Sequence, residues 1–496
     1  MRVRLILLAT LVSASADASP NVPSDDPAYD ALARLQALDV LPPISGGFLP
    51  LTRHRVARLL GGTATRPGVW FEPIDRLRLT TTLFHDRARP FDTSLRPRDL
   101  TIGSLSIACE HTEGRPCGNG AGNFTELSSN AGYGDWVSAS VRLRAQAGQH
   151  FNNAIELDRL YLNSELGPVA VEVGRDVVAF GPSARTHLAW GDNAPPITHA
   201  RLSTSEPFPL TSNLRGSAVY LVGRLRSPQT VHSNLVTISR LQLDIANNVE
   251  VGLMQLLQLG GDGASELGVW DFIAEHIRRS DLTASASDSS NRRFGGDVAF
   301  RIRDLSGARF YFSLIFEDIR KTYWYDAVRY DADHLLGIDL AAIGPGRRHG
   351  LTVEWQQTGH RSQEHRPRTT GFTNGGRVVG SSLGPDAKSL YAGGRVELGW
   401  GTLYPWLELA WLSSDTYQLV VDGPINPLAD GVTESRYRLG TRVRLPLPYD
   451  LSIEANALAE HVDSFAFDPA ANRTNFGLVA SVTWQPHVAL GTLQRD

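Results

Sequence analysis

Beyond about residue 75, hydrophobic and polar residues alternate along the chain with a period of two. Residues 308–316 read ARFYFSLIF, with large apolar side chains at alternate positions and arginine, tyrosine and serine among the positions between them. Residues 390–400 and 476–484 repeat the pattern. Successive side chains of a β-strand point to opposite faces, so the pattern predicts antiparallel strands with one apolar and one polar face.

The length of these segments and the spacing of their connections favour a membrane barrel over a soluble sheet. The segments run about 10–13 residues, which is longer than a usual strand and near the length that a tilted membrane strand needs. Short turns alternate with long polar loops, and aromatic residues recur at segment ends, both as in outer-membrane barrels. The turns are expected near 304–307, 345–347, 400–402 and 446–449, and the loops near 319–333, 360–387, 415–433 and 461–473.

The strand count follows from the same pattern. About 14 segments are clear strands, and an even total is typical of these barrels. We therefore predict an all-β, antiparallel transmembrane barrel of about 18 strands, within a range of about 14–18. Four segments are ambiguous, and the last of them has a short helix inside a long loop as its alternative: 75–86, 101–108, 198–206 and 266–275.

The N-terminus has the features of a secretory signal peptide. Arg2 and Arg4 precede an apolar run over 5–12, and small residues follow as far as Ala18. This predicts a signal peptide over residues 1–18, with a buried first helix as the alternative. A chain exported in this way, with membrane strands and no long apolar run, is expected in the outer membrane of a Gram-negative cell.

Residues 19–72 show helical periodicity and are predicted to be a periplasmic helical segment. Tyr29, Leu32 and Leu35 share one helix face, and Thr52 offers an N-cap for a second short helix. The barrel is then expected over 73–496. Because the final strand follows a long loop, we expect both termini in the periplasm.

Charge and cysteine content narrow the chemistry. The formal net charge is −4, which argues against nucleic acid as a partner. Cys109 and Cys117 are expected to form a disulfide in an oxidising compartment, with a metal site that includes His111 as the weaker alternative.

No motif indicates catalysis or a cofactor. The GSSLG stretch at 380–384 lacks the strand-to-helix context of a nucleophile elbow around Ser382. His360, Glu364 and His365 lie close together in sequence, but a solvated polar loop is the simpler interpretation. We therefore expect no enzymatic activity, no catalytic residue, no resident metal and no cofactor.

Two stretches are candidates for glycan contact. The loop over 320–333 concentrates aromatic residues beside charged ones, and aromatic faces stack on the C–H faces of sugars; its alternative is a girdle at the headgroup level. The stretch 171–202 loses strand periodicity and becomes rich in Gly and Pro, which predicts a loop that folds into the lumen, or otherwise a surface loop. The candidate glycan-binding residues are Tyr323, Trp324, Tyr325, Tyr330 and Trp190.

Residues 436–445, RYRLGTRVRL, carry arginine on one parity and bulky apolar residues on the other. The following strand places glutamates on its inward parity, and a tight turn joins the two. Inward arginine and glutamate can therefore lie across from each other. This predicts a lumenal charge network that either fills the barrel or lines a channel: Arg436, Arg438, Arg442, Arg444, Glu454 and Glu460.

Three features of the sequence resemble the outer-membrane capsule-assembly family called Wzi. The first is the pair of N-terminal helices. The second is VGRDVVAFGPS and the third is WGDNAPP, which match through Gly174, Arg175, Gly181, Pro182, Asn193, Ala194 and Pro196. The resemblance implies a monomeric barrel of about 18 strands with helices at its periplasmic mouth. It also implies a lectin-like, non-enzymatic role in which the barrel binds capsular polysaccharide.

Three functional hypotheses remain at this point. The favoured one is a barrel that binds capsular or extracellular polysaccharide and supports its attachment at the cell surface, with outer-membrane lipid as the other partner. The main alternative is a carbohydrate-selective or general diffusion porin, because residues 35–60 also resemble a surface-layer homology repeat of the kind that precedes some porins. The third is a membrane-embedded hydrolase.

The stretch after Trp484 departs from the aromatic C-terminus common in barrels.

Overall fold

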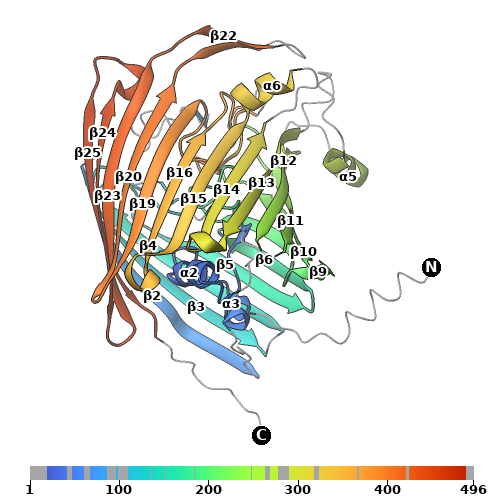
Figure 1. Cartoon of the computed structure of the whole chain (residues 1–496), viewed down its shortest axis with the longest axis vertical. Coiled ribbons are helices and arrows are strands. Elements are labelled where there is room, and N and C mark those ends of the chain that lie inside the picture. Colours follow the sequence, from blue (N-terminus) through green and yellow to red (C-terminus); the bar gives the residue numbers. More distant parts are fainter. Residues whose placement is uncertain are drawn as a thin grey trace, which may run out of the picture.

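The computed structural model describes residues 19–41, 47–60, 68–85, 97–98, 110–134, 136–149, 151–183, 185–246, 248–262, 268–277, 290–317, 323–365, 368–419 and 424–486. Within them the chain forms one closed barrel of 18 antiparallel strands (Figure 1). Strands β8 and β9 both pair with β10 and together occupy one position. The barrel closes where β2 pairs with β25, so the predicted fold class is confirmed.

Each barrel strand follows its predecessor around the wall. The strands are β2 (Val69–His85), β3 (Gly120–Tyr133), β4 (Val137–Gly148), β5 (Ala154–Leu166), β6 (Val169–Asp176), β8 (Ile197–Thr204), β9 (Phe208–Thr211), β10 (Leu214–Arg224), β11 (Leu235–Ile245), β12 (Val249–Leu259), β13 (Ser290–Ile302), β14 (Ala308–Phe316), β15 (Asp333–Ile343), β16 (His349–Gln357), β19 (Ala387–Leu398), β20 (Gly401–Ser413), β23 (Thr433–Leu447), β24 (Leu451–Asp463) and β25 (Arg473–Trp484).

Short and long connections alternate over the C-terminal half of the wall, whereas the connections from β3 to β6 are all short. Turns such as 303–307 and 399–400 lie at one end, which we call the short-turn end. Loops such as 358–386 and 414–432 lie at the other, the long-loop end. The four turns and four loops expected in the C-terminal half all occur, because turn residues interrupt the period-two pattern where each strand ends.

The ambiguous segments resolve in different ways. Residues 75–85 of the first segment lie in β2, and residues 198–204 of the third lie in β8. The stretch 266–275 contributes a helix, α5 (Val269–Ile277), as the alternative allowed. A short apolar run can satisfy either period, so its type is settled by its contacts. The segment 101–108 lies outside the described residues, as do the signal peptide 1–18 and Cys109.

The N-terminal segment (residues 19–41 and 47–60) packs inside the short-turn end of the barrel, with α2 (Ala28–Ala37) and α3 (Arg53–Leu59) in blue in Figure 1. Thr52 caps α3 by accepting a hydrogen bond from the Arg55 amide at 3.2 Å. The segment has a small apolar core of its own: Val22, Leu32, Leu41, Leu51 and Val56. The first barrel strand begins at Val69, four residues before the expected boundary.

A second body of chain fills the middle of the lumen. The connection from β6 to β8 folds inward, and its short strand β7 (Ala179–Phe180) pairs with β1 (Phe48–Leu49) of the N-terminal segment. Part of the loop from β16 to β19 joins it, including β17 (Thr373–Asn374) and β18 (Arg377–Val378). We call the described residues of 177–196 together with 368–383 the lumenal plug. Its apolar side chains form one core with inward residues of the wall.

The remaining elements lie at the long-loop end, above the barrel rim in Figure 1. They are α6 (Trp324–Asp326) and the hairpin of β21 (Thr416–Leu419) with β22 (Ile425–Ala429). No helix among the described residues is both long enough and apolar enough to cross a membrane.

The assignment of alternate strand residues to the lipid-facing side of the barrel leads to a first prediction. Leu439, near the middle of β23, is 62% exposed on the face opposite the inward arginines. Leu439→Arg should lower the free energy of unfolding by about 2–4 kcal/mol, because a cation at mid-depth meets hydrocarbon. Leu447→Arg, at the short-turn end of the same strand, is the matched control and should cost roughly 0–1 kcal/mol. Urea unfolding in lipid vesicles measures both, and equal costs would contradict the outward assignment.

Candidate functional site

The inner wall of the barrel holds paired charges. Arg438 is fully buried and forms ion pairs with three carboxylates at 2.7–3.1 Å, from Glu460, Glu408 and Glu110. Glu460 lies directly across from it on β24. A buried cation is costly unless it is paired. The three carboxylates therefore compensate the buried charge of the Arg438 guanidinium.

The other arginines of β23 have partners too. Arg444 pairs with Glu454 at 2.9 Å, again directly across the ladder. Arg436 pairs with Glu434, two residues earlier on its own strand, at 2.6 Å. The Arg442 guanidinium lies 4.3 Å from the ring centroid of Tyr404 on β20. The structure thus brings all four arginines inward, two of them onto the glutamates expected from the sequence.

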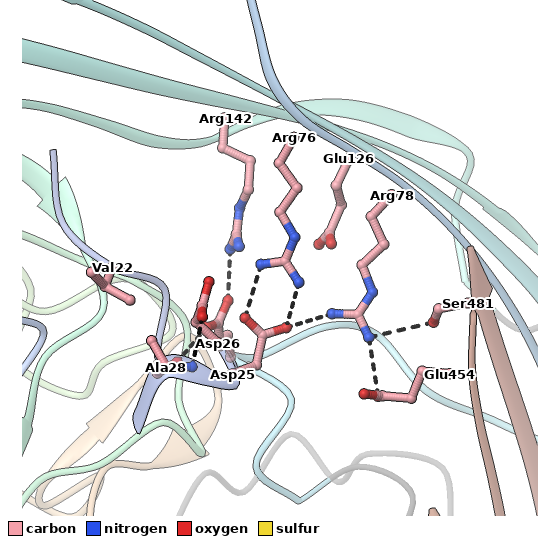
Figure 2. A network of polar contacts seen from close by, with 12 residues as sticks. Val22, Asp25, Asp26, Ala28, Arg76, Arg78, Glu126, Arg142, Glu454 and Ser481 are labelled. Carbon is pink, nitrogen blue, oxygen red and sulfur yellow. Dashed lines mark hydrogen bonds and ion pairs between the residues drawn. The ribbon is translucent and has the colours of Figure 1, made fainter. Parts of the chain in front are cut away.

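The N-terminal segment inserts an acid into this charged wall. Asp25 accepts hydrogen bonds from Arg76 at 3.0 and 3.1 Å and from Arg78 at 2.6 Å (Figure 2). Arg78 also donates to Ser481 on β25, the closing partner of β2, and to Glu454 on the neighbouring β24. Burial raises the pKa of Asp25, but Arg76 and Arg78 outweigh that effect and hold the pKa well below its usual range.

Further polar contacts fix the segment at other points of the wall. Asn21 donates to Glu172 at 2.7 Å and to Asp176 at 2.8 Å, both on β6. Thr52 donates to Glu165 on β5 at 3.0 Å, and Arg53 pairs with Asp75 on β2 at 2.8 Å. The N-terminal segment is therefore held inside the short-turn end by charged groups from several strands.

The lumenal plug is apolar at its centre. Phe180 stacks on Phe48 with ring centroids 6.2 Å apart. Trp190 is only 2% exposed and belongs to the same core. This corrects the expectation for Trp190 as a glycan-binding residue, because its ring is covered by protein on the inside of the barrel.

The seven motif residues lie along the path of the chain into the plug. Gly174 has φ of +146°, and a Cβ there would come within 2.2 Å of the Leu160 carbonyl oxygen, so the wall requires glycine at this point. Gly181 also has positive φ, at +137°. Arg175 donates to the Leu157 carbonyl at 3.1 Å, which fixes β6 to β5 where the chain turns inward.

The second half of the motif tethers the plug. The carbonyl of Pro182 accepts from Arg309 on β14 at 2.6 Å. Asn193 donates to the Val378 carbonyl at 2.9 Å and so joins the two parts of the plug. Ala194 and Pro196 are buried beside it. The motif residues therefore have structural positions in the plug.

Three rings from different long loops meet at the opposite end of the barrel. Tyr330 and Tyr417 have ring centroids 5.8 Å apart, and His360 lies 4.7 Å from Tyr417. Two acids border them, with Asp386 accepting from the Tyr417 hydroxyl at 3.4 Å and Asp331 contacting His360 at 3.0 Å. We call these five residues the aromatic cluster. Tyr330 and Tyr417 keep part of their surface exposed.

Charge around the aromatic cluster is mixed. Arg361 pairs with Asp331 through two hydrogen bonds of 3.0 and 2.6 Å. Burial raises the pKa of Asp386 to about 6, although Arg98 lowers it in part. The cluster thus presents ring faces beside hydrogen-bond acceptors and a guanidinium, the groups that sugars require.

The expected aromatic stretch divides into two parts. Tyr330 belongs to the aromatic cluster, whereas Tyr323, Trp324 and Tyr325 are exposed at the start of α6. Trp324 and Tyr325 pack edge to face, with centroids 6.1 Å apart. Tyr417, His360 and Asp386 were absent from the sequence-based glycan candidates because they lie on two loops other than that of Tyr330. Only the length of those loops could have drawn attention to them.

The residues considered for metal binding have other partners. His111 contacts Asp192 at 2.8 Å, and His360 contacts Asp331. The described part of the chain contains no group of three or more side chains placed to hold a metal ion. Because Cys109 lies outside that part, its disulfide with Cys117 stays a prediction. Ser382 donates to Glu110 at 3.1 Å within the lumen.

Residues 104–475 match the family model for the capsule assembly protein Wzi. The chain belongs to the Wzi capsule assembly family. Among solved structures, Wzi of Escherichia coli superimposes with a TM-score of 0.67 at 15% identity, over 95% of this chain and 100% of that one. It is described as an outer membrane protein involved in group 1 capsule assembly and as a carbohydrate-binding β-barrel. The likeness shows that this member of the Wzi family shares its fold.

Other barrels resemble the chain less closely. OccD3 of Pseudomonas aeruginosa gives a TM-score of 0.47 at 11% identity, over 90% of this chain and 99% of that one. OprD of the same organism gives 0.44 at 10% identity, over 86% and 98%. The search of curated proteins found no match.

The contact in Figure 2 generates a second prediction for this Wzi-family barrel. Asp25→Asn removes the charge between Arg76 and Arg78 and should weaken docking of the N-terminal segment by about 1–3 kcal/mol. Proteolysis within residues 19–60 of the folded barrel should then accelerate at least about fivefold. Asp39→Asn is the matched control, since the Asp39 side chain is 60% exposed and pairs with Arg303 at the surface.

The same contact sets a pH dependence. A carboxylate with a lowered folded-state pKa contributes fully above its unfolded value of about 3.9, and its contribution is lost only as pH falls through the lower folded value. The native segment should therefore resist protease equally at pH 7 and pH 5. Cleavage of Asp25→Asn at the native rate, or a native segment released at pH 5, would contradict the assigned contact.

Proposed function

We propose that the protein binds capsular or other extracellular polysaccharide at the long-loop end of the barrel and supports its attachment at the cell surface. The observation that carries this proposal is the aromatic cluster, in which rings from three loops meet beside two acids. In this proposal the long loops face outward and both termini face the periplasm. The barrel acts as a monomer.

The chemistry of the aromatic cluster suits a sugar chain. The partly exposed faces of Tyr330 and Tyr417 offer surfaces for sugar C–H groups. Asp386 and Asp331 offer oxygens that accept hydrogen bonds from hydroxyls, and Arg361 offers a donor for acidic sugars. The name of the Escherichia coli relative, a carbohydrate-binding β-barrel, supports the same class of ligand.

We also infer a binding role rather than a catalytic one. The hydroxyl of Ser382 is bonded to the carboxylate of Glu110 and not to a histidine. The lumenal acids around Arg438 are held in ion pairs. Neither arrangement supplies an activated nucleophile beside a general base.

The plugged lumen argues against the alternative of a diffusion porin. The N-terminal segment occupies the short-turn end, and the lumenal plug packs against inward wall residues at the middle. Purified protein in a planar bilayer should therefore give little steady current at any voltage that leaves the bilayer intact. A large, stable conductance comparable with that of an open porin would favour the porin alternative instead.

Binding itself tests the role of the aromatic cluster. Tyr417→Ala and Tyr330→Ala should each weaken binding of the cell's own capsular polysaccharide by about fivefold to tenfold, which corresponds to a loss of about 1–1.4 kcal/mol for one contacting ring. Tyr417→Phe keeps the ring and should lose less. Tyr449→Ala, an exposed tyrosine on a turn at the other end of the barrel, is the matched control.

Folding of each variant is checked by its heat-modified mobility in gels, and affinity by surface plasmon resonance on purified polysaccharide. Native affinity in the Tyr330→Ala, Tyr417→Ala double variant would exclude the aromatic cluster as the site. Normal capsule retention in a deletion strain, together with no polysaccharide binding by the native protein, would overturn the proposed function as a whole.

A further inference from the structure

Helix α5 lies on the outside of the barrel. The Nε2 atom of His276 lies 3.1 Å from the Tyr220 hydroxyl on β10 and 3.1 Å from the Thr237 hydroxyl on β11. Tyr220 points away from the lumen, because its neighbours Val219 and Leu221 are both in the lumenal core. In Figure 1 the helix stands beside β11 and β12, clear of the barrel interior.

A second pair of contacts fixes the helix to β13. Glu275 accepts from the Ser290 hydroxyl at 2.7 Å and pairs with Arg292 at 3.5 Å. Ser290 and Arg292 both face outward, since Asn291 between them and Arg293 after them are buried on the inside of the barrel. Glu275 and His276 of α5 are therefore held against the barrel wall, whereas Asp271 is exposed and accepts a hydrogen bond from the Gly268 amide at 3.2 Å.

The rest of α5 presents an apolar face that no described part of the chain covers. Val269 is 75% exposed, Trp270 81% and Ile273 42%. Trp270 and Ile273 are three residues apart and share one side of the helix, whereas Glu275 lies on the opposite side. Val269 is exposed at the first turn, two turns before His276. A helix that directs polar groups at its own barrel and large apolar groups away from it needs an apolar surrounding on that free side.

The height of α5 along the barrel wall indicates what surrounds its exposed apolar side chains. Thr237, which touches the helix, pairs with Leu257 on β12, and both are buried. Four residues further down the same two strands, Leu241 and Leu253 face outward and are about equally exposed. Four residues of strand span about 13 Å. The apolar face of α5 therefore continues the lipid-facing surface of the barrel upward by less than one leaflet thickness.

We propose that α5 is an interfacial helix that inserts Val269, Trp270 and Ile273 into the lipid of the outer leaflet and anchors the long-loop end at a fixed depth. Tryptophan is enriched at membrane interfaces, where an apolar ring with a polar N–H is favoured. Amphipathic helices lie in the same layer with their apolar face buried by about 5–10 Å. The lipid here is bound by a loop helix rather than by the strands that cross the membrane.

The test places a reporter on each face of α5. Trp270→Cys and Ile273→Cys on the free face are labelled with an environment-sensitive fluorophore in barrels reconstituted into vesicles of brominated phosphatidylcholine. Leu253→Cys on the lipid-facing wall is the positive control. Leu428→Cys, an exposed residue of the β22 hairpin, is the negative control, and the native chain gives the background of Cys109 and Cys117.

The proposal expects brominated lipid to quench both α5 reporters by at least half of the fractional quenching seen at Leu253→Cys, and aqueous iodide to quench them weakly. Strong iodide quenching with no effect of brominated lipid at both positions would overturn it, since the face would then be in water. Protection from both quenchers, with cross-linking between copies through Trp270→Cys, would overturn it in favour of a second copy of the chain. Two reporters on one face keep the result independent of any single label.

Discussion

The whole structure depends on one constraint, which is that backbone polar groups inside hydrocarbon must pair with each other. An antiparallel sheet meets it only when no edge is left, and here the edge is removed where β2 pairs with β25 from Leu77 opposite Trp484 to His85 opposite Phe476. Closure divides every strand into an outward face for lipid and an inward face for protein. The period-two pattern of the sequence is the direct consequence, because each strand must satisfy both faces at once.

Closure also creates an enclosed interior that must be filled or hydrated, and this chain fills it with charge. Moving an ion from water into such a space costs several kcal/mol of folding free energy unless partners of opposite charge lie close by. Arginine suits the task because its planar fork bonds two carboxylate oxygens at once and its face stacks on rings. Arg438 among three glutamates and Arg442 over Tyr404 illustrate the two modes. Asp25 extends the same chemistry to the N-terminal segment, which is thereby held within the barrel.

Contacts between strands joined by a short turn could be predicted from the sequence. Contacts between residues that are far apart in the sequence could not. The turn between β23 and β24 fixes their register, so the pairs Arg438 with Glu460 and Arg444 with Glu454 follow from parity and spacing. Nothing local indicates that Glu110, 328 residues away, completes the same cluster. Trp190 was misjudged for this reason, since an aromatic residue in a glycine-rich loop can face solvent or a core, and only the packing of two remote loops decides between them. The aromatic cluster has the same origin, with one ring from each of three loops.

The lumenal plug and the aromatic cluster are parts of one structural unit. The loop over 358–386 supplies Phe372 and Val379 to the buried core at its centre, and His360 and Asp386 to the aromatic cluster at its two ends. Packing the middle of the loop therefore fixes the positions of its ends before any ligand arrives. A flexible loop would lose about 0.5–1.5 kcal/mol for each side chain that a ligand orders, and a loop held by the plug avoids much of that cost. For the sugar chain that we propose as the ligand, which would offer weak contacts spread along its length, such preorganisation is a physical reason to pack this loop against the lumenal core.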